Sequence, residues 1–263
     1  MKTDDQPASY YQVVVGRALA SLGEWQLAHE AFAQATISKP DYAEAWAFLG
    51  ESDYQLGHDN YPALKRALEL NPQSSAAQSL MGLYWIRLGQ PEKALAIFTR
   101  LVRQEPAQAV WEIQSGDALA RMGQPAYAMV HYQNAVKIDP GDPQNWFQLV
   151  LFCLQNDLEV RRIGLPAARR LVMLTPDDPA AYDLHGRVLM TLGDQDNALQ
   201  AFWRGLKLNG SSPQLLLDVG MLEMDRHKSS EAFYYLSMAL EMGRQQKDAS
   251  LVKKAQSLLS QEP

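Results

Sequence analysis

Apolar residues recur along the chain every three to four positions, with polar residues between them. A clear example spans residues 75–108, where one apolar-faced segment ends at Gly89 and a second ends before Pro106. This spacing is typical of amphipathic helices, whereas half-buried strands alternate every second residue. Runs of β-branched residues with strand-like alternation do not occur in the sequence. The pattern therefore predicts an all-helical protein built from short helices.

Glycine and proline recur in step with this pattern. Glycines inside the predicted helices are spaced by 32, 34 or 70 residues: Gly16, Gly50, Gly82, Gly116, Gly186 and Gly220. A parallel series of prolines is spaced by 32 to 36 residues: Pro40, Pro72, Pro106, Pro140 and Pro176. A glycine inside a helix normally costs about 1 kcal/mol relative to alanine, so its regular return needs a reason. The sequence therefore contains an internal repeat of about 34 residues.

Each repeat reads as two helices joined by a short turn. In the example above, Gly89 ends the first helix as a C-terminal cap, and Pro91 begins the second at its first turn. Pro106 cannot continue a helix and marks the passage to the next repeat. Acidic residues at such junctions, including Asp142 and Asp178, are expected to cap the helices that follow. Because the turns are short, the two helices are predicted to be antiparallel neighbours.

Seven repeats account for most of the chain. Their predicted bounds are 9–42, 43–74, 75–108, 109–142, 143–178, 179–212 and 213–246. A polar N-terminal tail, 1–8, precedes them, and residues 247–263 are expected to form a polar-backed C-terminal capping helix and a tail. The second repeat is two residues shorter than the period and the fifth is two residues longer. These departures either alter the local helix packing or reflect neutral change in loops.

Small and large residues return at matching places in the repeats. The turn between the two helices carries Gly23, Gly57, Gly89, Gly123 and Gly193. The second helix carries a small residue, Ala28, Ala94, Ala128, Ala198 or Ala232, and four positions later Phe32, Phe98, Tyr132, Phe202 or Leu236. Small residues on facing helices let the helices approach closely, and the large residue is expected to fill the gap left between neighbouring repeats. Together with the helical glycines, this pattern resembles the tetratricopeptide repeat (TPR) family. The resemblance implies an all-α fold, a right-handed α-solenoid or superhelix of seven helix-turn-helix repeats with a C-terminal capping helix.

Composition narrows the function classes. The chain is 47% hydrophobic and 21% charged, with a net charge of −6, so it is expected to fold and not to bind nucleic acid. The longest apolar stretch, near residues 146–154, is about half of the ~20 residues that a membrane helix requires, so no membrane insertion is predicted. Met1–Ser9 lacks the character of a signal peptide, and Cys153 has no second cysteine to pair with. These features favour a cytoplasmic location.

Motifs for catalysis are not found. The sequence has no glycine-rich phosphate loop, no HExxH and no cysteine pair. Its five histidines lie in five different repeats without metal-ligand spacing: His29, His58, His131, His185 and His227. Cys153 lies among apolar residues and is expected to be a small buried hydrophobe rather than a reactive thiol. The sequence therefore predicts no catalytic residue, no cofactor and no metal site.

The resemblance also implies a binding surface. In TPR proteins the first helix of each repeat lines a concave groove, and an apolar groove edged by charges suits a bound helix or extended peptide. The matching positions that we predict to bind a partner are Leu83, Ile86, Arg87, Ile113, Asp117, Arg121, Phe147, Leu151, Leu154, Arg187, Met190, Leu217 and Met221. The alternative is that tight winding buries some of these side chains against neighbouring helices.

The resulting hypothesis is a non-catalytic protein-protein interaction scaffold that binds a partner peptide or helix in its groove. Two alternatives stay open. The chain is either a regulatory or targeting module of a larger enzyme or of a secretion or assembly machine, or a structural protein that self-associates through its repeats.

Overall fold

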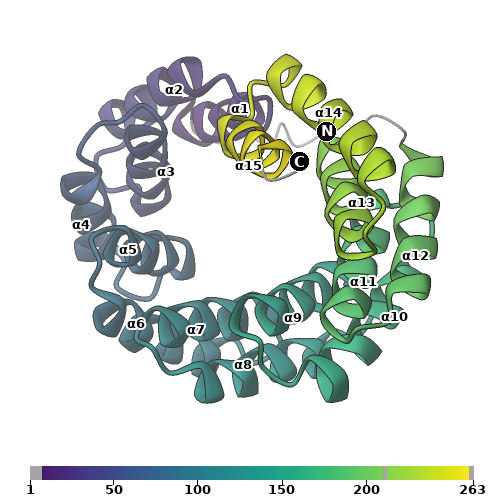
Figure 1. The fold of residues 1–263 in the computed structure, drawn as a ribbon. Coiled ribbons are helices and arrows are strands. Elements are labelled where there is room, and N and C mark those ends of the chain that lie inside the picture. Colours follow the sequence, from purple (N-terminus) through teal and green to yellow (C-terminus); the bar gives the residue numbers. More distant parts are fainter. Residues whose placement is uncertain (1–7, 210–211, 261–263) are drawn as a thin grey trace, which may run out of the picture. The chain divides into compact units, whose positions relative to one another are not determined.

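The computed structural model describes residues 8–209 and 212–260. Every regular element within these ranges is a helix, and successive helices pack against one another as pairs (Figure 1). The predicted all-α class, built from successive helix pairs, is therefore confirmed. Most of the predicted N-terminal tail, at residues 1–7, and the last residues of the C-terminal tail, 261–263, lie outside the described residues. None of the described helices combines the length and the apolar content needed to cross a membrane.

The helices are α1 (Ala8–Ser21), α2 (Trp25–Ser38), α3 (Ala43–Gln55), α4 (Tyr61–Leu70), α5 (Ser75–Arg87), α6 (Pro91–Gln104), α7 (Ala109–Arg121), α8 (Pro125–Ile138), α9 (Pro143–Asn156), α10 (Leu165–Leu174), α11 (Pro179–Thr191), α12 (Gln195–Leu208), α13 (Pro213–Asp225), α14 (Ser229–Gln245) and α15 (Ala249–Leu259), with a π-helical turn, η1 (Val160–Gly164), before α10.

Two compact units make up the chain, Met1–His131 (unit 1) and Tyr132–Pro263 (unit 2), with the boundary inside α8. In unit 1, α1 packs on α2, α3 on α4 and α5 on α6, and each pair also contacts the next pair. In unit 2, the pairs are α9 with α10, α11 with α12 and α13 with α14, and α15 packs on α13 and α14. Each unit therefore builds its core from contacts between neighbouring pairs.

The turns and junctions follow the predicted chemistry. The five turn glycines all have positive φ angles, between 67° and 80°, a conformation that costs other residues about 1–2 kcal/mol. At the junctions, the Asp142 carboxylate accepts a hydrogen bond from the Gln144 N–H, and the Asp178 carboxylate accepts one from the Ala180 N–H, each at 2.9 Å. Both predicted caps and all five predicted turn glycines are confirmed.

The large residue of the second helix packs directly against the glycine of the first helix in the same pair. A Cβ atom added at Gly16 would lie 2.5 Å from the Phe32 ring, and one at Gly82 would lie 2.6 Å from the Phe98 ring. Phe32 also stacks on Phe48 of the next pair, with ring centroids 5.4 Å apart. The large residue therefore fills space within its own pair as well as between pairs, whereas the sequence predicted only the second role.

The long fifth repeat has an irregular connection. After α9, Asp157 and Glu159 adopt left-handed backbone conformations, with φ angles of 47° and 52°, and η1 leads directly into α10. The Arg162 guanidinium donates two hydrogen bonds to the Glu159 carboxylate, at 2.9 and 3.1 Å. The two additional residues are therefore accommodated by a sharp turn and a widened helical turn, which keep the chain in contact with α9 and α11.

Candidate partner-binding surface

The predicted partner-binding residues of unit 1 lie on α5 and α7. Leu83 and Ile86 are half-buried and pack against the core around Phe98. Arg87 is exposed, and its guanidinium carbon lies 3.3 Å from the centre of the Tyr54 ring on α3. This cation–π contact orders a charged group on the surface that the first helices share, and such contacts contribute about 0.5–1 kcal/mol when exposed.

The α7 residues divide between core and surface. Arg121 is exposed and Asp117 is half-buried, as a surface role requires. Ile113 is only 8% exposed. The Ile113 side chain is therefore buried, and its role as a partner contact stays a prediction.

Charged and aromatic side chains continue this surface onto α1 and α3. The Arg17 guanidinium lies 5.3 Å from the centre of the Phe48 ring and 3.9 Å from the Glu44 carboxylate. Burial raises the pKa of the Glu51 carboxyl, and Arg17 partly offsets that rise. We name the set Arg17, Glu44, Tyr54, Arg87 and Arg121 the first-helix surface of unit 1. It is more polar and more aromatic than the apolar groove that the sequence predicts for the middle repeats.

In unit 2 the predicted residues lie on α9, α11 and α13. Phe147, Leu151 and Leu154 on α9 are half-buried, as are Met190 on α11 and Met221 on α13. Leu217 is 1% exposed and packs in a core cluster with Leu236 and Leu251. The Leu217 side chain therefore lies in the core of unit 2, and its role as a partner contact stays a prediction.

Two carboxyl groups meet inside unit 2. Asp183 on α11 and Asp218 on α13 are both buried, and the Arg187 guanidinium lies 3.7 Å from the Asp183 carboxylate. Burial, the charge of Asp218 and a hydrogen bond to Asp218 together raise the pKa of Asp183 to about 8, while Arg187 opposes the rise. The Gln214 side-chain amide donates a 2.8 Å hydrogen bond to Oδ2 of Asp218. Arg187, which the sequence predicts as a partner contact, is therefore half-buried and engaged within the protein.

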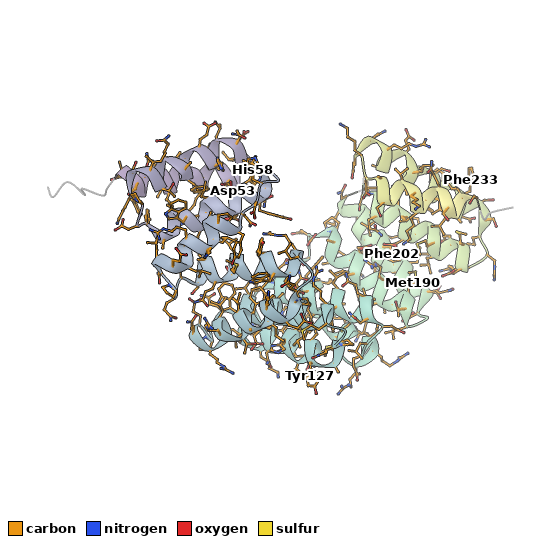
Figure 2. All side chains as sticks on the ribbon, turned by 90° about the vertical axis from the view of Figure 1, so that its left-hand side faces the viewer. Asp53, His58, Tyr127, Met190, Phe202 and Phe233 are labelled. Carbon is orange, nitrogen blue, oxygen red and sulfur yellow. The ribbon has the colours of Figure 1, made fainter. Side chains whose placement is uncertain are left out.

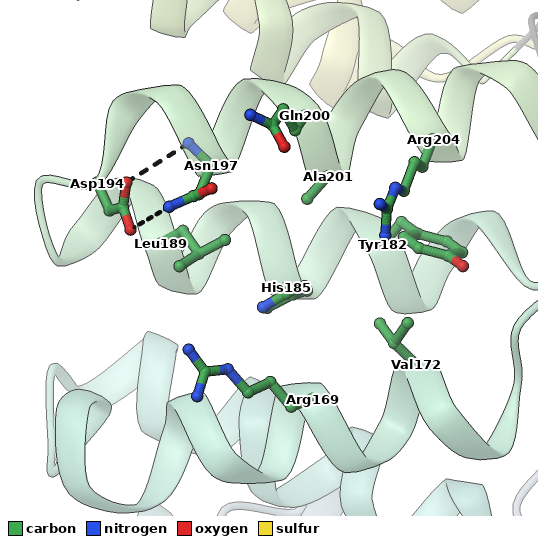
Figure 3. A pocket seen from close by; sticks show the side chains of 10 residues that line it. All are labelled: Arg169, Val172, Tyr182, His185, Leu189, Asp194, Asn197, Gln200, Ala201 and Arg204. Atoms are coloured by element: carbon green, nitrogen blue, oxygen red, sulfur yellow. Dashed lines mark hydrogen bonds between the residues drawn. The ribbon is translucent and has the colours of Figure 1, made fainter.

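A cavity of about 310 Å³ opens between α10, α11 and α12 (Figure 3). Arg169, His185 and Arg204 give it a basic character, and burial together with the two arginines lowers the pKa of His185. Asp194 lies at one end, where its carboxylate caps α12 and accepts a 2.8 Å hydrogen bond from the Asn197 amide. None of these residues was predicted as a site. The available signal was a histidine at a repeat position where other repeats have Val15, Leu49, Met81 or Val219.

Large aromatic side chains are exposed on the second helices, another feature that the sequence-based site did not include. Tyr127 on α8 is 68% exposed, and Phe233 on α14 is more than half exposed (Figure 2). Tyr234 on α14 is also more than half exposed. The Tyr234 and Tyr235 rings lie 5.2 Å apart, and Trp203 of α12 lies 6.5 Å from Tyr235. Unit 2 therefore presents a second, aromatic surface on α12 and α14.

The cysteine has the character that the sequence predicts. Cys153 is buried, and burial raises the pKa of its thiol to about 12. A thiol with that pKa is protonated at neutral pH and is a poor nucleophile. The prediction of a buried hydrophobe is confirmed.

Comparison with known proteins connects the fold to a family. A model of the tetratricopeptide repeat family matches residues 16–57 and 62–109. A peroxisomal targeting signal receptor from Saccharomyces cerevisiae is 23% identical over 235 residues, which are 85% of this chain and 37% of the receptor. The chain therefore spans little more than a third of that relative's length.

Solved structures share the fold. A tetratricopeptide repeat protein from Parabacteroides merdae has a TM-score of 0.67 and 13% sequence identity, covering 95% of this chain and 99% of its own. YrrB, described as a TPR protein with an unusual peptide-binding site, has a TM-score of 0.53 and 18% identity, covering 74% of this chain and 98% of its own. At these identities the likeness is one of fold.

Proposed function

We propose that this chain, which belongs to the tetratricopeptide repeat family, is a non-catalytic scaffold that binds a peptide or helix of a partner protein on its first helices. The observation that carries the proposal is the first-helix surface of unit 1, where Arg87 stacks on Tyr54 and Arg17 lies against Phe48. Ordered charges beside aromatic rings can position a partner segment, while half-buried apolar side chains nearby supply affinity.

In unit 2, the proposal extends to Phe147, Leu151, Leu154, Met190 and Met221, which are half-buried on first helices. Two comparisons support the peptide class of partner. The yeast relative is a targeting signal receptor by name, and YrrB is described as having a peptide-binding site. A cytoplasmic location is part of the same proposal, supported by the single, buried cysteine. A regulatory or targeting module of a larger protein would use the same surface.

Charge reversal on the first helices tests this function. We expect Arg87→Glu with Arg121→Glu to reduce capture of the partner from native lysate at least about tenfold, because oppositely charged flanks on the partner become repelled. Both side chains are exposed, so the helical circular dichroism spectrum should not change. The matched control is Arg100→Glu with Arg103→Glu, which reverses two exposed arginines on α6 and should leave capture intact.

Equal capture by the wild type and the α5–α7 variant would overturn the proposed surface. Loss of capture in a Trp203→Ser, Tyr234→Ser variant instead would move the site to the exposed aromatic surface of α12 and α14. Recovery of only further copies of this chain would favour self-association.

A further inference from the structure

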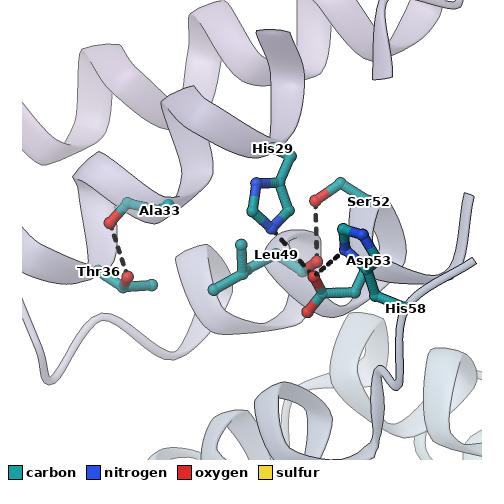
Figure 4. Close-up of polar contacts among 7 residues, drawn as sticks. All are labelled: His29, Ala33, Thr36, Leu49, Ser52, Asp53 and His58. Carbon is teal, nitrogen blue, oxygen red and sulfur yellow. Dashed lines mark hydrogen bonds and ion pairs between the residues drawn. The ribbon is translucent and has the colours of Figure 1, made fainter. Parts of the chain in front are cut away.

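Two imidazoles and a carboxylate converge in unit 1, and none of the three residues belongs to the first-helix surface. His29 extends from α2, Asp53 from the last turns of α3, and His58 from the turn that follows α3 (Figure 4). Asp53 Oδ1 lies 3.0 Å from His29 Nε2 and 3.5 Å from His58 Nδ1. One ligand atom from each of the three residues lies within 4.8 Å of the other two.

The backbone holds this arrangement. Gly57 has a φ of 77°, which reverses the chain after α3. The His58 N–H then donates a 2.8 Å hydrogen bond to the carbonyl oxygen of Asp53. Asp53 therefore accepts a hydrogen bond from the His58 main chain, and its carboxylate also lies beside the His58 side chain. The His58 ring is thus kept next to the carboxylate.

The donor set matches a first-row metal, and its ligand atoms all lie within 4.8 Å of one another. Imidazole nitrogens and a carboxylate oxygen bind Zn²⁺ at about 2.0–2.2 Å, so neighbouring ligands of a tetrahedral ion lie about 3.3 Å apart. The two contacts with Asp53, at 3.0 and 3.5 Å, bracket that separation. Three protein ligands leave a fourth position for water, and the His58 side chain, which is 58% exposed, gives access from solvent.

A second histidine–carboxylate contact in unit 1 provides a comparison. His131 Nδ1 lies 2.5 Å from the Glu112 carboxylate, but this pair contains only one imidazole. Within residues 8–209 and 212–260, the His29–Asp53–His58 cluster is the group in which three such ligands approach closely enough for one ion. A hydrogen bond between one histidine and one carboxylate, as in His131–Glu112, needs no second imidazole, whereas the His29–Asp53–His58 cluster has one.

We propose that His29, Asp53 and His58 bind one Zn²⁺ ion, with water as the fourth ligand. The ion would join α2 of the first pair to the turn that follows α3 in the second pair. It would therefore stabilise the packing of these two pairs, because an ion that binds only the folded state shifts the equilibrium towards folding.

Zinc titration of the full, tag-free chain tests the site. We expect one Zn²⁺ per chain by calorimetry, and a higher thermal unfolding midpoint in the presence of Zn²⁺. Co²⁺ as a second probe should give the visible absorption of a four-coordinate ion. His29→Ala and His58→Ala should each weaken Zn²⁺ binding about tenfold or more and remove the thermal shift. The Co²⁺ band should be lost in His58→Ala.

His227→Asn is the matched control, because it removes an exposed imidazole from another turn and asparagine tolerates the positive φ of that position. It should bind Zn²⁺ like the wild type. His58 is exposed, so its variant should keep the wild-type circular dichroism spectrum. No saturable Zn²⁺ binding by the wild type, or equal affinity in the wild type and both alanine variants, would overturn the proposal and leave a hydrogen-bonded cluster.

Discussion

The Asp183–Asp218 pair makes the stability of unit 2 sensitive to pH. In the unfolded chain, Asp183 should titrate near its ordinary pKa of 3.8, whereas burial and Asp218 raise its pKa in the folded protein to about 8. Between these values the folded state holds a proton that the unfolded state has lost. The contribution of Asp183 to the free energy of unfolding is therefore fully present below the pKa that Asp183 has in the unfolded chain. It falls as the pH rises towards the pKa in the folded protein, by up to about 1.4 kcal/mol per pH unit.

Replacing Asp183 with asparagine should remove this dependence. An amide at this position would keep the shape of the protonated acid and cannot ionise, so we expect Asp183→Asn to be more stable than the wild type at pH 8.5 and to lose that advantage near pH 4. Urea unfolding across this pH range measures the difference. Asp225→Asn, at an exposed position of α13, is the control and should follow the wild type. Parallel pH profiles for the wild type and Asp183→Asn would contradict the expectation.

In six helix pairs one turn residue has a positive φ, whereas the connection between α9 and α10 has two, Asp157 and Glu159. Five pairs have a glycine with positive φ at this place, but the α13–α14 turn has His227, whose φ is 59°. A residue with a side chain pays about 1–2 kcal/mol to adopt the left-handed region. Glycine avoids this cost, but its greater conformational freedom in the unfolded chain cancels part of the benefit. The seventh pair therefore contains strain that the five glycine turns avoid.

Glycine at this turn should relieve the strain. We expect His227→Gly to raise the free energy of unfolding by about 0.5–1 kcal/mol, as measured by chemical denaturation. The His227 side chain is exposed, so its removal sacrifices little packing. The reciprocal change, Gly193→Ala in the α11–α12 turn, should lower stability by a similar amount, because Gly193 has a φ of 78°. A loss of stability in His227→Gly would show that its side chain matters more than its backbone.

At the scale of the whole molecule, stability is distributed among neighbouring pairs. Leu251 of α15 is buried and lies against the position where a Gly243 side chain would be. The core cluster that includes Leu251 also contains Leu217 and Leu236, so α15 protects the open side of α13 and α14. In a repeat array, opening at this end need not disturb distant pairs.

Hydrogen exchange can detect such local opening. Leu251→Ala should cost about 2–5 kcal/mol in the last pairs and accelerate amide exchange there at least tenfold, while α1–α7 keep their wild-type rates. Lys254→Ala, at an exposed position of the same helix, should leave exchange unchanged throughout. Equal acceleration along the entire chain would mean that both units open in a single cooperative step.

Local chemistry made much of the fold predictable. Turn glycines such as Gly89 and junction caps such as Asp142 act over a few residues, and the structure has both. The helical glycines also identified where helices approach closely. The sequence did not identify which side chain packs against each helical glycine. Phe98 packs against Gly82 of its own pair, in addition to filling space between neighbouring pairs.

The sequence by itself determined the helical class and the pairing of helices, because periodicity, caps and turns are written within short segments. It also assigned residues to one face of each helix, but it did not identify the helices that pack over that face. Only the tertiary structure showed that Ile113 and Leu217 are buried, because the sequence pattern does not say which helices pack over a given face. The same reason applies to His29 and Asp53, which are 24 residues apart in sequence and become neighbours only when α2 packs on α3.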